Sequence, residues 1–292
     1  MTDPERLTLE LPTHRAAALA WGDPGGRPVV ALHGFPDTAW AWRHVGPLLA
    51  AEGFRVVAPF TRGYAPSDLP ADGCYDVPAL MADAVAVHAA IDGGSDALLV
   101  GHDWGAITAN GLGAHPDSPY AGVVAIAVPP LGALPTPRPR SLLRQARRSR
   151  YIGFHQLPVL PERTLHRRVP GLWARWSPGF DATEDLGHVR AALDTPARQR
   201  AAIETYRGLT RPWRLPAAYR SWARTWTGTP VGPYRYLHGV DDGCMGPDLV
   251  VGLPDRLPAG AAVELVEGAG HFVPQERPDA VVDAVLALGA AG

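Results

Sequence analysis

The chain has 292 residues, of which 46% are hydrophobic and 19% charged, so it can bury the core of one large domain or of a core domain with an inserted subdomain. The 27 basic residues, all arginine, nearly balance the 29 acidic ones, which argues against a nucleic-acid-binding protein. The N-terminal segment lacks the apolar stretch of a signal peptide, and no run is long enough to span a membrane. We therefore expect a cytoplasmic protein.

The first 130 residues alternate between strand-like and helix-like segments. Two segments at the start are expected to pair as antiparallel strands, and four short apolar runs follow that are typical of buried strands. Helix-like stretches separate these runs, which predicts an α/β fold with a mostly parallel sheet and helices on both faces. The expected strands are 7–12, 15–22, 27–34, 54–60, 96–102 and 121–130, and the expected helices are 39–53, 76–92 and 105–116.

The character of the sequence changes between residues 131 and 229. This part is rich in Arg, Trp and Pro, contains no apolar strand run, and has helical patterns at 141–158 and 195–208. Afterwards the strand and helix signals resume, with strands expected at 234–239 and 261–268 and a helix at 277–289. We predict a core domain formed by residues 1–130 and 230–292, and a helical cap formed by residues 131–229 and inserted after the sixth strand.

The segment "GHDWG" at 101–105 follows a predicted strand and precedes a predicted helix. Small residues on both sides allow a turn so sharp that the middle side chain stands above the sheet. This pattern predicts Asp103 as a nucleophile. The alternative is that Asp103 only caps the following helix, which is a favoured position for Asp.

A nucleophile of this kind needs a base and an acid that orients it. His271 lies in "GAGHFVPQERP" after the last predicted strand, where a loop reaches the top of the sheet, and we predict that it is the base. The segment "YLHGVDDGCM" ends a strand and offers Asp241 and Asp242. We favour Asp242 as the acid, with Asp241 as the alternative.

The segment "LHGFPDTAW" at 32–40 follows the third predicted strand. A turn here can direct the N–H of Phe35 towards the nucleophile, and the N–H of Trp104 would supply a second donor for an oxyanion. The alternative is a plain tight turn whose shape is fixed by Pro36. We also expect Pro36 and Trp40 to contact the substrate.

Together, "HGFPDTAW", "RGYAPSD", "GHDWGA", the HGxxD pattern ending at Asp242 and "GAGHFVPQERP" resemble the α/β-hydrolase superfamily. The order nucleophile, acid, base is that of its catalytic triad. The aspartate nucleophile is similar to that of the branch containing epoxide hydrolases and haloalkane dehalogenases. One departure is Phe60, which stands where these families commonly have Asp.

This resemblance implies a hydrolase with the α/β-hydrolase fold that opens a small apolar epoxide to a vicinal diol. Asp103 would form an ester with the substrate, and water activated by His271 would hydrolyse that ester. The cap segments around Tyr151 and Tyr219 are similar to those that carry the two ring-opening tyrosines of epoxide hydrolases, and Tyr206 is the substitute if either assignment fails.

The alternatives to this function are a haloalkane or haloacid dehalogenase with the same nucleophile, and a non-catalytic ligand-binding protein of the same fold. The only two cysteines, Cys74 and Cys244, lack metal-binding spacing, and no nucleotide-binding loop is visible. We expect no metal, no cofactor and no nucleic-acid partner. A homodimer is compatible with the sequence.

Overall fold

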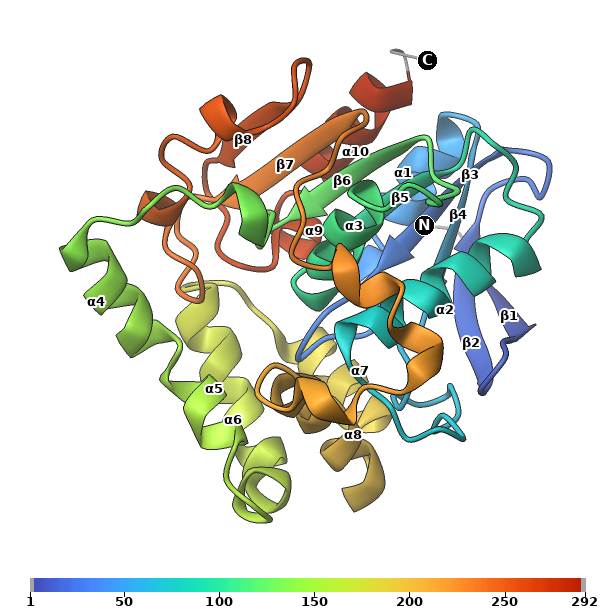
Figure 1. Cartoon of the computed structure of the whole chain (residues 1–292). Helices are drawn as coiled ribbons and strands as arrows, with labels where there is room; N and C mark the ends of the chain where they lie inside the picture. The colour runs from blue at the N-terminus through green and yellow to red at the C-terminus, as the bar shows by residue number, and fades with distance from the viewer. Residues whose placement is uncertain (1–2, 290–292) are drawn as a thin grey trace.

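An eight-stranded sheet forms the centre of the protein in this computed structural model, which describes residues 3–289 (Figure 1). The strand order is β1-β2-β4-β3-β5-β6-β7-β8. Strand β2 pairs antiparallel with both β1 and β4, and all other neighbours are parallel. The strands are β1 (Glu5–Glu10), β2 (Arg15–Trp21), β3 (Arg27–Leu32), β4 (Phe54–Pro59), β5 (Leu98–His102), β6 (Gly122–Ile126), β7 (Tyr234–Gly239) and β8 (Ala262–Val266).

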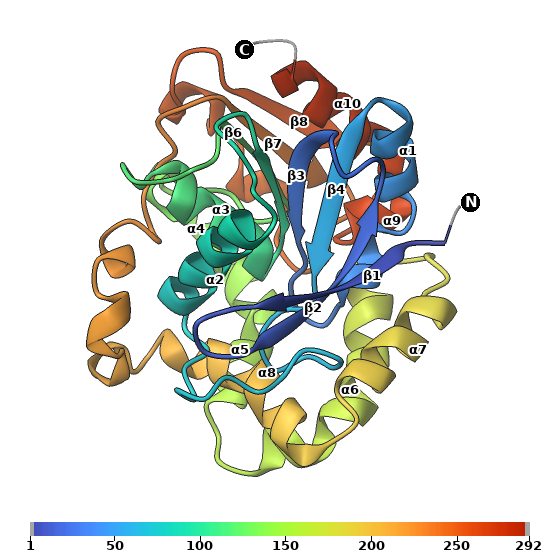
Figure 2. The same ribbon diagram turned by 90° about the vertical axis from the view of Figure 1, so that its right-hand side faces the viewer.

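Helices cover both faces of this sheet, as predicted for the α/β-hydrolase fold (Figure 2). Helices α1 and α10 contact each other on one face, and α2 and α3 contact each other on the opposite face. The short helix α9 leads into α10. The core helices are α1 (Val45–Ala51), α2 (Val77–Ala90), α3 (Trp104–Gly113), α9 (Val273–Glu276) and α10 (Pro278–Gly289).

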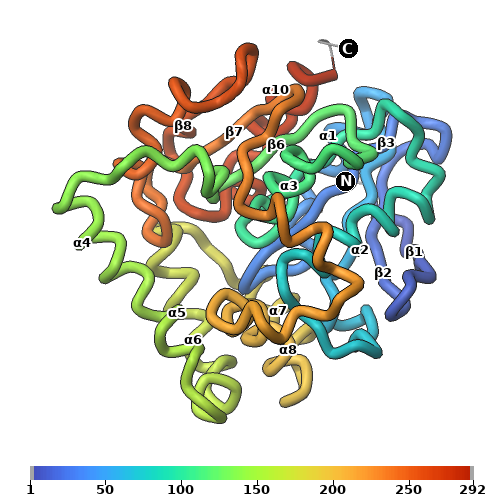
Figure 3. The backbone as a smooth tube through the Cα atoms, viewed as in Figure 1, coloured from blue at the N-terminus to red at the C-terminus, as the bar shows by residue number. Residues whose placement is uncertain are grey.

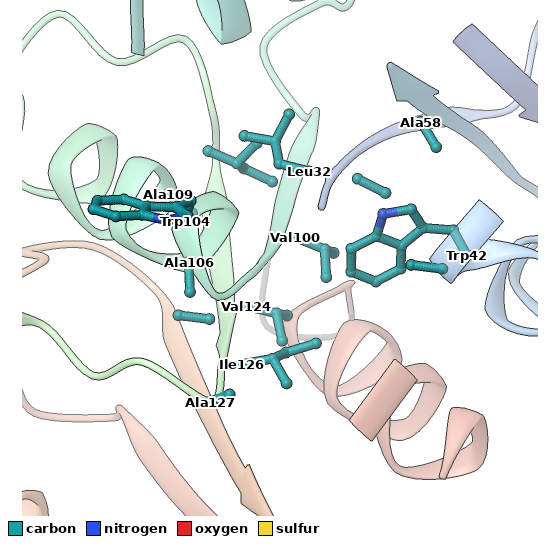
Figure 4. Packing of buried hydrophobic residues seen from close by; sticks show 14 of the residues in the cluster. Leu32, Trp42, Ala58, Val100, Trp104, Ala106, Ala109, Val124, Ile126 and Ala127 are labelled. Carbon is teal, nitrogen blue, oxygen red and sulfur yellow. The ribbon is translucent and has the colours of Figure 1, made fainter. Parts of the chain in front are cut away.

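The central strands are apolar because both of their faces are covered. All five residues of β5 and all five of β6 are buried, which is the pattern of a parallel sheet between helical layers. Figure 4 shows Val100 and Val124 on these strands, with Trp42 packed on one side and Ala106 and Ala109 of α3 on the other. Burial of these side chains fixes the carboxyl ends of the strands, which carry the residues of the candidate site.

Between β6 and β7 the described chain forms helices and no strand. These helices lie together below the sheet in Figure 1, apart from α4 at its left margin. We call residues 131–229 the cap; its limits as a separate domain stay a prediction. Its longer helices are α4 (Pro139–Arg148), α5 (Arg150–His155), α6 (Leu160–Trp176), α7 (Thr183–Ala192) and α8 (Pro196–Gly208), and its short 3₁₀ helices are 131–133, 212–214, 217–219 and 222–224.

Two helix predictions differ in detail from the structure. The predicted helix at 141–158 is divided at Ser149 into α4 and α5. The predicted helix at 39–53 is a 3₁₀ turn at Ala39–Trp42, followed by α1. Thr38 caps that turn by accepting a hydrogen bond from the Trp40 N–H, which favours an early, short turn. No helix within residues 3–289 is long and apolar enough to cross a membrane.

Candidate active site

Asp103 occupies the sharp turn between β5 and α3. Its backbone has a φ of 54°, a left-handed conformation that is uncommon for a residue with a side chain. A Cβ at Gly105 would collide with the Leu32 carbonyl, and one at Gly34 would collide with the Asp103 carboxylate. The glycines therefore permit the tight approach of the strand, the helix and the 33–38 loop that presents the Asp103 side chain.

The Phe35 N–H donates a 2.8 Å hydrogen bond to Asp103 Oδ1, and this contact is buried. Trp104 is the first residue of α3, so its N–H belongs to the free N-terminal end of the helix beside Asp103. No hydrogen bond from the Trp104 N–H to the carboxylate is recorded within residues 3–289. Of the two predicted donors, the Phe35 N–H thus already binds the Asp103 carboxylate, and the Trp104 N–H belongs to the next residue in the sequence.

His271 links the two carboxylates predicted for the triad. Its Nδ1 lies 2.8 Å from Asp242 Oδ2, and its Nε2 lies 3.6 Å from Asp103 Oδ2. Asp242 Oδ1 also accepts hydrogen bonds from the N–H groups of Cys244 and Met245, at 2.6 and 2.8 Å. The structure therefore brings Asp242 to His271, whereas Asp241 is exposed.

The charges around His271 control its protonation. Burial lowers the pKa of this imidazole, but the negative charges of Asp242 and Asp103, together with the hydrogen bond to Asp242, outweigh burial and raise the pKa to about 10. Burial alone would raise the pKa of the Asp242 carboxyl. The positive charge and hydrogen bond of His271 outweigh burial and hold that pKa below its usual value. With Asp103 ionised, His271 is therefore protonated at neutral pH and lies between two carboxylates.

Two cap phenols lie beside this group. The ring of Tyr206, at the end of α8, packs edge-on against Phe35 and Trp104, with centroid distances of 5.1 and 4.9 Å. Tyr151, on α5, packs against Tyr206 at 5.6 Å. The Tyr151 hydroxyl lies 3.6 Å from the Sγ of Cys244, two residues after Asp242. Both phenols therefore approach Asp103 from the cap side.

Both phenols remain protonated. Burial raises the pKa of each well above its usual value, and the negative charge of Asp103 raises it further. The Tyr206 hydroxyl is buried and has no hydrogen-bond partner within residues 3–289, and the same is true of His271 Nε2. Each of these two atoms can donate a hydrogen bond to a further polar group.

The prediction for Tyr219 is not supported by the structure. Its hydroxyl donates a hydrogen bond to Asp72, and Arg62 lies over its ring at 5.6 Å. It packs with the buried residues Cys74 and Ala79, and none of its recorded contacts within residues 3–289 reaches Asp103. These charged partners on the 61–76 loop hold Tyr219 at a separate contact between the cap and the core. Tyr206, the substitute proposed from the sequence, lies beside Phe35 and Trp104, next to Asp103.

The two predicted substrate contacts also lie between the core and the cap. Trp40 stacks on His188 of α7, with centroids 4.7 Å apart. The Pro36 carbonyl accepts a 2.9 Å hydrogen bond from the indole of Trp173 on α6. Trp40 is half-buried, with His188 stacked on its ring, and substrate contacts at Trp40 and Pro36 stay predictions.

Two residues that the sequence did not reveal position His271. The Trp176 carbonyl accepts a 3.0 Å hydrogen bond from the His271 N–H. The His102 ring packs 4.9 Å from the His271 ring, and its Nε2 lies 2.9 Å from the His271 carbonyl. His102 is adjacent to Asp103 in the "GHDWG" motif, but Trp176 lies in the cap and no pattern connects it to the base.

The described residues contain no group of three or more His, Cys, Asp or Glu side chains placed to hold a metal ion. Phe60, which departs from the family pattern, is buried at the end of β4 beside Arg62 and His33, outside the triad. The polar side chains brought together at the site are carboxylates, an imidazole and phenols.

Comparison with known proteins agrees with this geometry. Residues 29–284 match the model of the alpha/beta hydrolase family, and the chain belongs to that family. Epoxide hydrolase A of Mycobacterium tuberculosis is 33% identical over 91% of both chains. The YfhM protein of Bacillus subtilis, described as an AB hydrolase superfamily protein, is 29% identical over 94% of this chain and 92% of its own.

Solved structures show the same fold. A candidate epoxide hydrolase from Klebsiella pneumoniae superposes with a TM-score of 0.80 at 24% identity, covering 98% of this chain and 97% of its own. An epoxide hydrolase from Vigna radiata gives a TM-score of 0.78 at 23% identity, covering 100% and 99%. The chain is a hydrolase related to the epoxide hydrolases, as its sequence motifs predicted.

Proposed function

We propose that this protein hydrolyses a small apolar epoxide to a vicinal diol through an ester on Asp103. The observation that carries the proposal is that two protonated phenols, Tyr151 and Tyr206, lie close to the carboxylate of Asp103 at the turn between β5 and α3. A carboxylate can attack a saturated carbon, and phenols can donate to the alkoxide that forms when an epoxide opens. The relatives named as epoxide hydrolases support this choice of substrate.

The two oxygens of Asp103 have different surroundings, which suggests different roles. Oδ1 accepts the hydrogen bond from the Phe35 N–H, whereas Oδ2 faces His271. We therefore assign Oδ2 as the attacking oxygen. It forms a bond to an epoxide carbon as the bond from that carbon to the ring oxygen breaks, and the ring oxygen takes a proton from a phenol. Oδ1 becomes the carbonyl oxygen of the resulting ester.

Formation of the ester changes the charge next to His271. Asp103 is neutral as an ester, so one of the two anions that raise the pKa of His271 is lost. The imidazole can then release its proton to the phenolate left by ring opening, and it becomes the base that activates water. Asp242 stays ionised and keeps the ring oriented through Nδ1.

Hydrolysis of the ester completes the cycle. Water loses a proton to His271 and attacks the carbonyl carbon of Asp103, and the negative charge that develops on Oδ1 is stabilised by the Phe35 N–H. The N–H of Trp104 can supply a second donor. Preorganised donors of this kind contribute about 3 kcal/mol each. The bond from the carbonyl carbon to the substrate oxygen then breaks, and that oxygen takes the proton left on the attacking water. The diol is released, Asp103 is ionised again, and His271 keeps the first proton of the water.

A dehalogenase is the second candidate. The indole N–H of Trp104 is buried without a partner within the described residues, and an indole is a suitable weak donor for a halide ion. Two phenols beside the same carboxylate favour the epoxide, because an alkoxide needs a proton and a halide does not.

Product analysis tests these functions directly. The purified protein is incubated with a styrene-oxide-type epoxide and, separately, with a bromoalkane. Diol without halide release supports the proposal. Halide release without diol supports the dehalogenase, and neither product, from folded protein, supports a ligand-binding role. The Asp103→Ala variant is the control for both reactions.

A further inference from the structure

Helix α4 presents an uncovered apolar face to solvent. Leu142 and Leu143 are 57% and 56% exposed, and Pro139 and Ala146 are also exposed. Successive residues of a helix are rotated by about 100°, which places these four side chains within an arc of roughly 100°. Arg140, Arg144 and Arg147 fall together next to that arc, so the exposed part of α4 is amphipathic and cationic.

The opposite face of α4 attaches the helix to the loop that carries the triad acid. The Gln145 side chain donates to the Cys244 carbonyl at 2.9 Å and accepts from the Gly246 N–H at 3.1 Å. Arg148 donates to the Asp242 carbonyl at 3.2 Å. Figure 3 shows α4 at the left margin of the molecule, with its outer side clear of other segments. The helix is thus anchored on one side, and the described part of the chain leaves its apolar arc exposed.

The charge of the whole cap matches that of this helix. Residues 131–229 contain 18 of the 27 arginines but only 6 of the 29 acidic residues, a net charge of +12. The rest of the chain, with 9 arginines and 23 acidic residues, carries −14. No acidic residue occurs between Asp117 and Glu162. Among residues 3–289, Arg144 pairs with Asp248, whereas Arg140 and Arg147 have no recorded ion pair.

We propose that the outer face of α4 binds the surface of a lipid bilayer that contains anionic lipids. An apolar arc beside a row of arginines is the combination found in helices that lie in the membrane interface. The apolar side chains would enter the headgroup region, and the positive field of the cap would favour a negatively charged surface. A second copy of the chain fits less well, because this small arc falls far short of the roughly 800 Å² per partner of a stable interface.

Vesicle co-sedimentation of the full chain tests the proposal. We expect binding to vesicles of phosphatidylcholine mixed with phosphatidylglycerol, release of that binding by high salt, and little binding to phosphatidylcholine alone. The double variant Leu142→Ser/Leu143→Ser and the double variant Arg140→Gln/Arg147→Gln should each bind at least about tenfold more weakly.

A matched control comes from exposed apolar residues outside the cap. Leu48 and Leu265 are 46% and 50% exposed, and Leu48→Ser/Leu265→Ser should bind vesicles like the wild type. All variants should retain epoxide turnover, since none of the changed side chains belongs to the site. Wild-type-like vesicle binding by the α4 leucine variant, equal binding to both kinds of vesicle, or no binding at all would overturn the proposal. So would a dimer in gel filtration that dissociates in the leucine variant while vesicles are not bound.

Discussion

The assignment of the ring-opening donors to Tyr151 and Tyr206, and not to Tyr219, can be tested with three Tyr→Phe variants. In Tyr206→Phe the ring keeps its packing against Phe35 and Trp104, and only the hydroxyl is lost. That hydroxyl has no partner among the described residues, so its removal leaves no protein group unsatisfied. We expect an unchanged or slightly higher free energy of unfolding.

The effect on catalysis should be large in comparison. A hydrogen bond to a developing charge contributes about 1.5 to 3 kcal/mol, which corresponds to a loss of roughly 10- to 100-fold in the rate of ester formation. Tyr151→Phe should give a similar loss of rate, because it removes the second proposed donor. Its stability should change little, since the hydroxyl makes only the weak 3.6 Å contact with Cys244. The double variant should be slower than either single variant. Hydrolysis of the ester does not use the phenols as proton donors to the substrate, so that step should change less.

Tyr219→Phe is the matched control. It removes the hydrogen bond to Asp72 at the contact between the cap and the core, which should cost about 1 kcal/mol of stability, or a Tm lower by about 2 °C. Ester formation should keep its wild-type rate. Rapid quenching after mixing with styrene oxide, followed by intact-mass measurement, gives the rate for each variant. A tenfold loss in Tyr219→Phe together with a normal rate in Tyr206→Phe would refute the assignment.

Three further changes test the roles of the triad. In His271→Gln, water is no longer activated, so an adduct of substrate mass should accumulate on the protein, and folded protein that binds substrate without any adduct would contradict a covalent route. Asp242→Asn should reduce turnover by at least about 100-fold because the imidazole loses its orienting acceptor, whereas Asp241→Asn should remain close to wild type, and equal losses would contradict the geometry. In Asp103→Ala, NMR titration should show the His271 pKa below the value of about 10 in the wild type, because one raising charge is gone. Since the folded protein holds this proton more tightly than the unfolded chain, wild-type stability should fall as the pH rises from about 6.5 to about 10. The same fall should be smaller in the variant, and an identical pH profile would contradict the charge coupling.

The core of the fold could be predicted because its signals are local. Buried parallel strands are short apolar runs, and the six runs predicted before residue 131 correspond to β1–β6. The catalytic motifs follow strand ends, and parallel strands bring their carboxyl ends to one edge of the sheet. Asp103, Asp242 and His271 could therefore be placed near one another without knowledge of their contacts.

The choice between Asp241 and Asp242 needed the structure. Adjacent residues point in different directions, and a shift of one position separates an exposed carboxylate from a buried one. The backbone N–H groups of Cys244 and Met245 turn back to bind Asp242. Turn geometry of this kind depends on contacts with His271 and the cap, so the sequence left both residues open.

The cap was harder to predict because nothing in its sequence sets the position of a side chain relative to the sheet. Tyr206 and Tyr219 are each followed by Arg and occur in similar surroundings, "ETYRG" and "AAYRSW". Tyr206 lies on a regular helix, α8, whereas Tyr219 lies in a 3₁₀ turn. Tyr219 is held by Asp72 and Arg62, which lie about 150 residues earlier in the chain. Such long-range partners cannot be read from local patterns, and they determine which tyrosine lies near Asp103.

The surroundings of Asp103 also explain why a carboxylate suits the sharp turn between β5 and α3. A serine at this position would offer a single oxygen. His271 would then act on the serine hydroxyl, and the Phe35 N–H would act on a carbonyl that belongs to the substrate. With Asp103, the same two groups meet the two oxygens of one side chain, at 2.8 Å and 3.6 Å. In the proposed reaction, the carboxylate that becomes the ester carbonyl is thus already in contact with both groups before any substrate arrives. The protein then needs only to recognise an electrophilic carbon and its leaving oxygen, which is the role proposed here for the phenols of the cap.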